Sequence, residues 1–143
     1  MDNFDVIIVG GGLAGLTAAI HLQRENYDVA VFESKPYPHH KVCGEYVSNE
    51  VKPYLEFLGV SLPQTFQFNE MLLSIEQGKA LKANLPMGGF GLSRYTFDHL
   101  LYQRALELGV NVFVNRVNSI KFENDKFRVG LESGQEYTSE FVI

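Results

Sequence analysis

The sequence predicts an α/β fold in which a parallel sheet is followed by an antiparallel β-meander. An almost continuous apolar run at residues 4–9 (FDVIIV), rich in β-branched residues, is typical of a strand covered on both faces. Residues 13–25 have the alanine and leucine content of a helix. Residues 29–32 (VAVF) form a second buried run, which completes a strand–helix–strand unit. Apolar and polar residues then alternate over residues 127–131, as in an antiparallel strand.

The other elements follow from turn residues and periodicity. We predict a loop at residues 34–47, then a short helix that Ser48 caps and Gly59 ends. A hairpin is predicted over residues 66–85, with its turn at residues 76–78. The later elements are a glycine-rich segment (87–92), a helix (96–108), a strand (110–114) and the runs of the meander (117–122, 127–131, 137–143). Seven phenylalanines are expected to lie mostly in the core: Phe66, Phe68, Phe90, Phe97, Phe113, Phe122 and Phe127.

Composition narrows the class of protein. With 45% hydrophobic residues, the 143-residue chain can bury the core of one globular domain, which excludes an intrinsically disordered chain. The net charge of −5 argues against a nucleic-acid partner. The single cysteine excludes an internal disulfide framework and a cysteine-based zinc site, and no metal site is expected. The longest apolar run, residues 6–20, carries four glycines and is too short to cross a membrane, so we predict a cytoplasmic protein without a transmembrane segment.

The most informative motif is Gly10-Gly11-Gly12-Leu13-Ala14-Gly15, a G-x-G-x-x-G between the first strand and the first helix. In this context the motif is a dinucleotide-binding fingerprint of a Rossmann-like domain. Gly10 permits the tight turn, Gly12 lets the backbone approach a pyrophosphate, and Gly15 lets helix and strand pack closely. Glu33 ends the next strand, where its carboxylate would accept hydrogen bonds from ribose hydroxyls and disfavour the 2′-phosphate of NADP. The motif alone does not distinguish FAD from NAD.

Two further motifs carry a resemblance to a known family. Residues 41–45 read Lys-Val-Cys-Gly-Glu, and residues 93–100 contain the pattern Arg-x-x-Phe-Asp-x-x-Leu. Together with the fingerprint, the chain resembles FAD-dependent oxidoreductases of the glutathione-reductase-like superfamily. Within it, the chain is most similar to the geranylgeranyl reductases and their relatives, the flavin-dependent halogenases and aromatic hydroxylases. The resemblance covers essentially the whole chain and implies FAD as the cofactor, in a Rossmann-like FAD-binding domain.

The resemblance also implies roles for individual residues. The glycine turn would hold the FAD pyrophosphate, Arg94 would reach the cofactor, and the backbone around Val117 would meet the adenine. Cys43 and Gly44 would lie near the isoalloxazine, and Lys41 stands where the hydroxylases often carry an arginine. The expected cofactor-binding residues are Gly10, Gly12, Leu13, Ala14, Gly15, Glu33, Ser34, Lys41, Cys43, Gly44, Arg94 and Val117. No catalytic residue is assigned from the sequence.

These features lead to three hypotheses about function. The main one is the FAD-binding portion of a geranylgeranyl reductase-like oxidoreductase, which reduces a carbon–carbon double bond of an apolar, isoprenoid-type substrate, with NAD(P)H as the electron donor. The alternative is a flavin-dependent monooxygenase or halogenase, in which reduced flavin reacts with oxygen. A second alternative is a cofactor-free binding protein on the same fold.

The end of the chain is interpreted as a truncation, because residues 141–143 are an apolar run without a turn or polar tail. The resemblance implies that a Gly-Ala-Asp-Gly-like element, whose aspartate binds FAD, and a substrate domain would follow. We therefore expect residues 1–143 to be the N-terminal portion of an FAD/NAD(P)-binding Rossmann-like domain, inactive by itself. Its sheet is expected to lack a central strand, or to end on an exposed edge that drives self-association.

Overall fold

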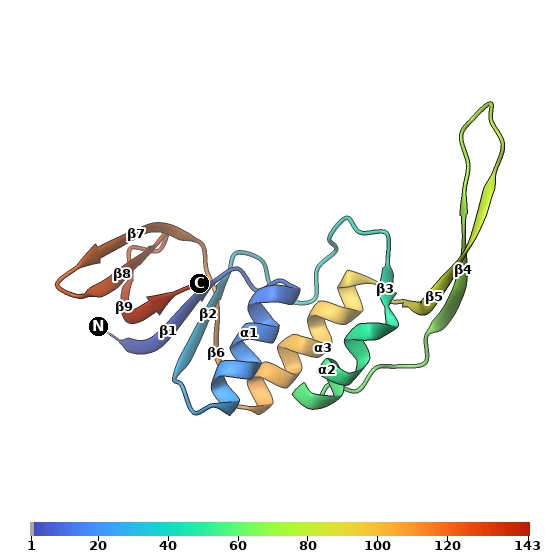
Figure 1. Ribbon diagram of the computed structural model, residues 1–143. Helices are drawn as coiled ribbons and strands as arrows, with labels where there is room; N and C mark the ends of the chain where they lie inside the picture. The colour runs from blue at the N-terminus through green and yellow to red at the C-terminus, as the bar shows by residue number, and fades with distance from the viewer. Residues whose placement is uncertain (1) are drawn as a thin grey trace.

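The computed structural model describes residues 2–143, which form two β-sheets with three α-helices and one 3-10 turn between them (Figure 1). In chain order the elements are β1 (Asn3–Val9), α1 (Leu13–Arg24), β2 (Val29–Glu33), β3 (Tyr46–Ser48), η1 (Asn49–Val51), α2 (Lys52–Leu58), β4 (Phe66–Leu73), β5 (Leu81–Gly91), α3 (Arg94–Glu107), β6 (Asn111–Val114), β7 (Val117–Glu123), β8 (Lys126–Leu131) and β9 (Glu136–Val142). The larger sheet has the strand order β6-β2-β1-β9-β8-β7, and the smaller one has the order β3-β5-β4.

Strand β1 lies in the middle of the larger sheet, parallel to β2 on one side and to β9 on the other. Strand β2 also pairs parallel with β6, which extends the parallel part of the sheet. Strands β7, β8 and β9 pair antiparallel and form the meander. The predicted fold class, an α/β domain with a parallel sheet plus an antiparallel β-meander, is confirmed.

Strand β9 corrects one expectation about this sheet. Residues 136–139 pair antiparallel with β8, where Tyr137 lies opposite Val129, and residues 138–142 pair parallel with β1 on the other side, where Phe141 lies opposite Val6. One continuous strand therefore ends the meander and also fills the place beside β1. The expectation of a missing central strand is wrong, because β1 has a partner on both sides. The outermost strands of this sheet, within the described residues, are β6 and β7.

The two faces of the parallel strands are covered by different elements. Val6, Ile8, Val29 and Val31 face the helices, where the first core contains Leu16, Ala19, Ile20, Leu55, Leu58, Val60, Phe90, Leu92, Phe97, Leu101, Ala105 and Val110. On the other face, Phe4, Ile7, Ala30 and Phe32 pack against Val129, Leu131 and Tyr137 of the meander. Burial on both faces explains why the sequence of β1 and β2 is almost continuously apolar.

The helix ends follow from local hydrogen bonding. Helix α3 begins at Arg94, two residues earlier than predicted, because the Ser93 hydroxyl accepts a hydrogen bond from the Thr96 N–H at 3.2 Å and caps the first turn. The Ser48 side chain makes no such bond, and a 3-10 turn precedes α2. Gly59 ends α2 in the left-handed conformation, with φ of +74°, as the sequence predicts. No helix in residues 2–143 has the length and apolar character that a membrane span requires.

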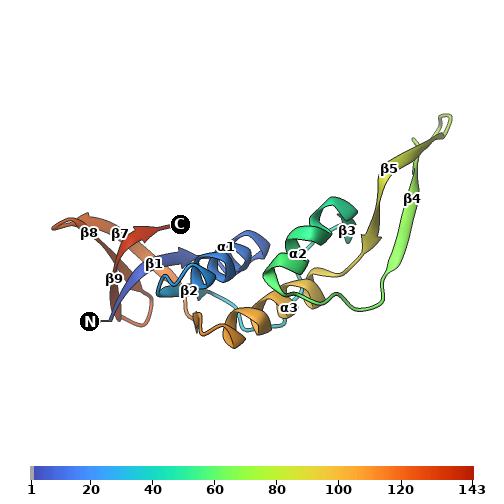
Figure 2. The same ribbon diagram turned by 60° about the horizontal axis from the view of Figure 1, so that its bottom comes forward.

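The smaller sheet differs from the prediction in extent. Strand β3 takes up the last two residues of the predicted loop 34–47 and Ser48, and β5 continues through the glycine-rich segment to Gly91. The reason is long-range pairing, since Tyr46 of β3 lies opposite Gly91 of β5. Figures 1 and 2 show the β4–β5 hairpin projecting beyond the helices, at the end of the molecule away from the larger sheet.

The prediction for the phenylalanines is wrong in part, because some of them lie on the projecting hairpin or on the outermost strand β7. Phe90 and Phe97 are buried in the core. Phe66 is 82% exposed on β4, and Phe122 is 62% exposed on β7. Apolar side chains in a strand predict that a face will be covered, but they do not identify what covers it.

Candidate functional site

The glycine turn connects the carboxyl end of β1 to the start of α1. Gly10 has φ of +109°, a conformation that side-chain-bearing residues rarely adopt, and its N–H donates to the Phe32 carbonyl at 2.8 Å, which ties the turn to β2. A Cβ at Gly15 would overlap the Gly10 carbonyl oxygen, so α1 packs against the turn only because Gly15 has no side chain. The turn thus lies at the carboxyl edge of the parallel strands, where α/β sheets bind ligands.

The N-terminus of α1 is open toward this edge. Gly12 is its N-cap residue, no side chain caps the helix, and the first turn carries no acidic residue. The first N–H groups of a helix have no partner within the helix, and the helix dipole places positive charge there. This arrangement favours a bound anion such as a pyrophosphate.

A cavity of about 540 Å³ opens above the turn. It brings together most of the residues predicted for the pyrophosphate and its surroundings: Gly10, Gly12, Leu13, Ala14, Gly15, Glu33, Lys41 and Arg94. An adjoining hollow of about 300 Å³ is lined by Gly10, Glu33, Ser34 and Val117, which places Ser34 and Val117 beside the same turn.

Cys43 and Gly44 do not line either hollow. Cys43 is exposed, and its sulfur accepts a hydrogen bond from the Glu45 N–H at 3.4 Å. Gly44 instead lines a third cavity, beside the smaller sheet. Lys41, two residues before Cys43 in the same loop, lies over the glycine turn, and the place of Cys43 and Gly44 beside an isoalloxazine stays a prediction.

Glu33 is buried, with 7% of its surface exposed, and it holds the turn as well as facing the cavity. Its Oε2 accepts a hydrogen bond from the Gly11 N–H at 3.0 Å. Its Oε1 accepts hydrogen bonds from the Ser34 hydroxyl and the Lys35 N–H, both at 3.1 Å. Burial alone would raise the pKa of Glu33, whereas the hydrogen bond from Lys35 and the charge of Lys41 act to lower it. Together with the bonds from Ser34 and Gly11, they lower the pKa below its ordinary value, so the carboxylate is ionised.

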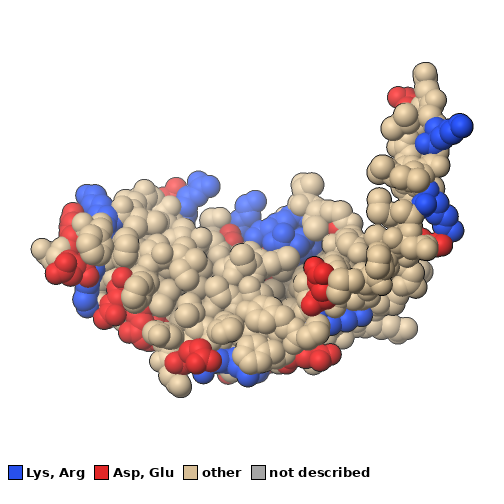
Figure 3. Space-filling view, viewed as in Figure 1, with Lys and Arg blue, Asp and Glu red and all other residues tan. Residues whose placement is uncertain are grey.

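Two cations lie over the turn. A Cβ at Gly12 would lie 3.6 Å from Arg94 Nη2 and 3.7 Å from Lys41 Nζ. Arg94 comes from the first turn of α3, and Lys41 comes from the loop after β2, where it lies 3.7 Å from Glu33 Oε2. Figure 3 shows basic side chains gathered at the centre of this face, where the loop after β2 passes α1 and α3. Both positive groups can therefore contact an anion bound at Gly12.

Tyr37 is a residue of the site that sequence reasoning missed. Its hydroxyl donates a hydrogen bond to the Gly11 carbonyl, and its ring stacks on Tyr102 with centroids 4.3 Å apart. Burial, followed by the charges of Glu33 and Asp98, raises the pKa of Tyr37 above its ordinary value, so the hydroxyl keeps its proton and donates. A Cβ at Gly11 would overlap this hydroxyl. The sequence signal for a close neighbour at this point was Gly11 itself, a glycine at a position of the motif that does not require one.

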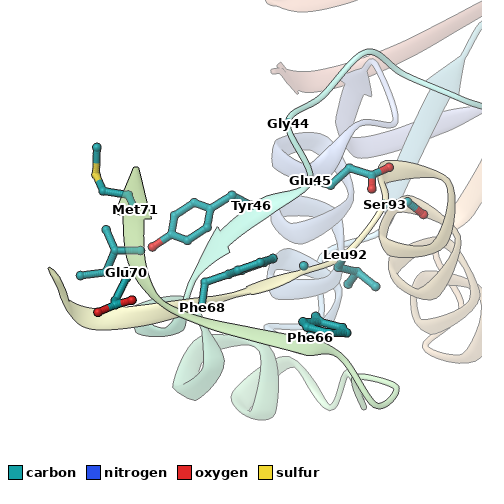
Figure 4. A pocket seen from close by; sticks show the side chains of 11 residues that line it. Gly44, Glu45, Tyr46, Phe66, Phe68, Glu70, Met71, Leu92 and Ser93 are labelled. Carbon is teal, nitrogen blue, oxygen red and sulfur yellow. The ribbon is translucent and has the colours of Figure 1, made fainter. Parts of the chain in front are cut away.

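The third cavity, which Gly44 lines beside the smaller sheet, was also not predicted. This cavity, of about 590 Å³, is lined on its aromatic side by Tyr46, Phe66 and Phe68, and by Met71 and Leu92. Figure 4 shows the Tyr46 and Phe68 side chains next to each other in this lining, with ring centroids 6.3 Å apart, and Leu92 and Ser93 just before α3. It is suited to a flat apolar molecule, because its walls are mainly aromatic and aliphatic.

The family model "FAD dependent oxidoreductase" (DAO) matches residues 5–42, the part that contains β1, the glycine turn, α1, β2 and Lys41. The chain is 29% identical to the flavin-dependent halogenase armH3 of Armillaria mellea, over 85% of this chain and 26% of that protein. It is 29% identical to the FAD-dependent monooxygenase atmM of Aspergillus flavus, over 99% of this chain and 32% of that protein. Over residues 5–42 the chain thus matches an FAD-dependent oxidoreductase family, and over most of its length it is similar to flavin-dependent halogenases and monooxygenases.

Solved structures agree with this assignment at the level of the fold. The flavin-dependent brominase Bmp2 superposes with a TM-score of 0.82 at 18% identity, over 98% of this chain and 37% of that one. The halogenase PltM in complex with phloroglucinol and FAD superposes with a TM-score of 0.79 at 20% identity, over 97% of this chain and 33% of that one. Together with the family-model match and the flavin-enzyme relatives, this agreement confirms the resemblance stated from the sequence and FAD as the cofactor.

The residues present fit FAD. The uncapped α1 N-terminus and the two cations over Gly12 match a pyrophosphate, and the hollow beside Ser34 and Val117 continues from it. No group of three or more His, Cys, Asp or Glu side chains that could hold a metal ion occurs within residues 2–143. The chain spans only about a quarter to a third of the curated relatives it matches.

Proposed function

We propose that the chain is the FAD-binding part of a flavin-dependent halogenase that acts on an aromatic substrate. The observation that carries the proposal is the cavity at the α1 N-terminus, with Lys41 and Arg94 over Gly12. The names of the relatives support the halogenase alternative better than the main sequence hypothesis of geranylgeranyl reduction. Because the FAD-dependent monooxygenase atmM is also a relative, a flavin-dependent monooxygenase is the second candidate function.

In this proposal the backbone of the chain binds the cofactor by its phosphates. The N–H groups of Leu13 and Ala14, in the first turn of α1, would donate to the pyrophosphate, whose two negative charges face Lys41 and Arg94. Glu33 would accept a hydrogen bond from the adenosine ribose while keeping its bond from the turn. Bound FAD supplies the electron transfer that the chain's own side chains cannot perform.

The apolar hollow beside the smaller sheet is the proposed place of the substrate. Its aromatic wall, with Tyr46, Phe66 and Phe68, would stack on a flat ring and exclude water from it. Gly44 lines this hollow, and Lys41 lies three residues earlier over the glycine turn, so one loop connects the two cavities. An aromatic or other apolar small molecule is therefore the substrate class that these residues favour.

The test uses the full-length protein with FAD, a flavin reductase, NADH and oxygen. Phloroglucinol is offered with bromide or chloride, and products are identified by mass spectrometry. A halogenated product supports the proposal, whereas a hydroxylated product with no halogen assigns the monooxygenase alternative. Reduction of an isoprenoid double bond without oxygen would instead restore the reductase hypothesis.

A separate measurement addresses the cofactor-free alternative. FAD and NAD are titrated separately into the FAD-free full-length protein and followed by calorimetry. The proposal expects binding of FAD, because the relatives are flavin enzymes and Lys41 and Arg94 face the cavity. If neither dinucleotide binds, the cofactor-free hypothesis is correct and the halogenase proposal fails.

A further inference from the structure

One buried acidic side chain near the site has no role in the function proposed above. Asp98, on the second turn of α3, is 1% exposed. Charged side chains are almost never fully buried unless they are paired. Asp98 is paired twice, with Arg94 on its own helix and with Lys41 from the loop after β2.

The geometry of the first pair is bidentate. Arg94 Nε donates to Asp98 Oδ1 at 2.7 Å, and Arg94 Nη2 donates to Asp98 Oδ2 at 2.9 Å. This hydrogen bonding, more than the charge of Asp98, raises the pKa of Arg94 above its ordinary value, although burial acts in the opposite direction. A bidentate contact fixes the plane of the guanidinium as well as its distance. Arg94 is therefore held in one orientation.

The second pair holds the other cation. Lys41 Nζ lies 3.4 Å from Asp98 Oδ2, the same oxygen that accepts from Arg94 Nη2. Both positive groups lie within 4 Å of the position of a Gly12 Cβ. One carboxylate thus sets the position of the two side chains that extend over the glycine turn from different segments of the chain.

We propose that Asp98 is a positioning residue for FAD: it orients Arg94 and Lys41 over Gly12 so that both meet the pyrophosphate. This inference rests on the FAD binding of the proposed function and adds to it a residue that does not itself contact the cofactor. Asp98 acts through preorganisation, because cations already held in place lose less conformational entropy when the anion binds.

The direction in which Asp98→Asn changes the FAD affinity distinguishes a positioning role from a simple charge effect. Asp98 is an anion near the proposed place of another anion. If only net charge mattered, Asp98→Asn would leave Arg94 without its carboxylate partner and Lys41 with Glu33 alone, and FAD would bind more tightly. If Asp98 positions the cations, the same change weakens FAD binding. Groups that orient binding residues typically contribute about 10- to 100-fold in affinity, as they do around metal ligands.

The experiment measures FAD dissociation constants and FAD release rates in the full-length protein, for wild type, Asp98→Asn and the control Glu107→Gln. Glu107 pairs with Arg104 at the exposed end of the same helix, so its change removes one negative charge far from Gly12. We expect Asp98→Asn to weaken FAD binding at least about tenfold, mainly through faster release. Glu107→Gln should bind FAD like wild type.

Folding is checked by circular dichroism and by the urea midpoint of the FAD-free protein. If Asp98→Asn does not fold, Asp98→Glu replaces it, because it keeps the charge and moves the carboxylate by one CH₂ group. Weaker FAD binding by a folded variant supports the proposal, and unchanged or tighter binding contradicts it. Failure of the wild-type protein to bind FAD would overturn the proposed function instead.

A double-mutant cycle shows whether Asp98 acts through Arg94. In an Arg94→Ala background, the guanidinium that Asp98 orients is gone. The further change Asp98→Asn should then cost several-fold less in FAD affinity than it does in the wild-type background. Equal costs in the two backgrounds would show that Asp98 does not act by positioning Arg94.

Discussion

Replacing Gly11 with alanine tests how the glycine turn is held. The first x of the motif is usually read as a free position. Here the Tyr37 hydroxyl occupies the space that a side chain would need, since a Cβ at Gly11 would overlap it. Tyr37 is half-buried between the turn and Tyr102, on which its ring stacks, so it cannot move away without losing contacts. Gly11→Ala is therefore expected to destabilise the protein through Tyr37.

The magnitude follows from two contributions. Displacing the hydroxyl breaks its hydrogen bond to the Gly11 carbonyl, at a cost of about 1 kcal/mol. Overpacking against the ring costs a further 1–3 kcal/mol or so, about 2–4 kcal/mol in all. Tyr37→Phe alone loses only the hydrogen bond, about 1 kcal/mol. Once the hydroxyl is removed, the nearest atoms to the new methyl group are Tyr37 Cζ and Glu33 Cβ, both at 3.0 Å. This tight contact costs less than the overlap, about 1 kcal/mol.

The assay is equilibrium urea unfolding of the FAD-free protein for wild type, both single variants and the double variant. Gly11→Ala should cost about 1–3 kcal/mol less in the Tyr37→Phe background than in wild type, a coupling typical of residues in contact. An equal cost in the two backgrounds, or a Gly11→Ala variant as stable as wild type, would refute the role assigned to Tyr37.

Three further predictions concern the same region. Gly15→Ala should destabilise the FAD-free protein by about 3 kcal/mol or more. The reason is that its Cβ would overlap the Gly10 carbonyl oxygen, a backbone atom that cannot rotate away. Urea unfolding measures the loss of stability, and a wild-type midpoint would contradict this prediction. The folded pKa of Glu33 is lowered, so its hydrogen bonds stabilise the turn above pH 4.5 and are lost as the pH falls through the folded pKa below that value. Glu33→Gln should remove this part of the acid dependence, and an unchanged pH profile of unfolding would show that Glu33 is not its source. Ser93→Ala should cost about 1 kcal/mol by removing the cap of α3, visible as a lower midpoint in urea, whereas an unchanged midpoint would show that the bond to Thr96 contributes nothing.

The parallel part of the fold could be predicted because its signals are local. Residues 4–9 are almost continuously apolar and residues 29–32 are apolar throughout, since helices cover one face and the meander covers the other. Strand β3 and the end of β5 carry no such signal, because they form through pairing between segments more than forty residues apart, such as Val47 opposite Phe90. A three-residue strand with polar neighbours looks like a loop until its partner is known.

The candidate site shows the same division. The glycines, Glu33 and Arg94 belong to motifs whose spacing reflects the ligand, and the structure gathers them around one cavity. Tyr37 lies in a loop without periodicity, and its role depends on a contact that a single sequence does not encode locally. Asp98 was visible in the Arg-x-x-Phe-Asp pattern, but its pairing with Lys41, a distant residue, becomes apparent only in three dimensions.

The most direct test of the account is the FAD affinity of a Gly12→Ala variant of the full-length protein. A Cβ at Gly12 meets only the flexible ends of Arg94 and Lys41, at 3.6 and 3.7 Å, so the FAD-free protein should unfold at the wild-type midpoint. The same methyl group would stand where the pyrophosphate approaches the backbone, and FAD binding should weaken by at least about tenfold, or 1.4 kcal/mol. Wild-type affinity for FAD in this variant would contradict the claim that the pyrophosphate rests on the glycine turn.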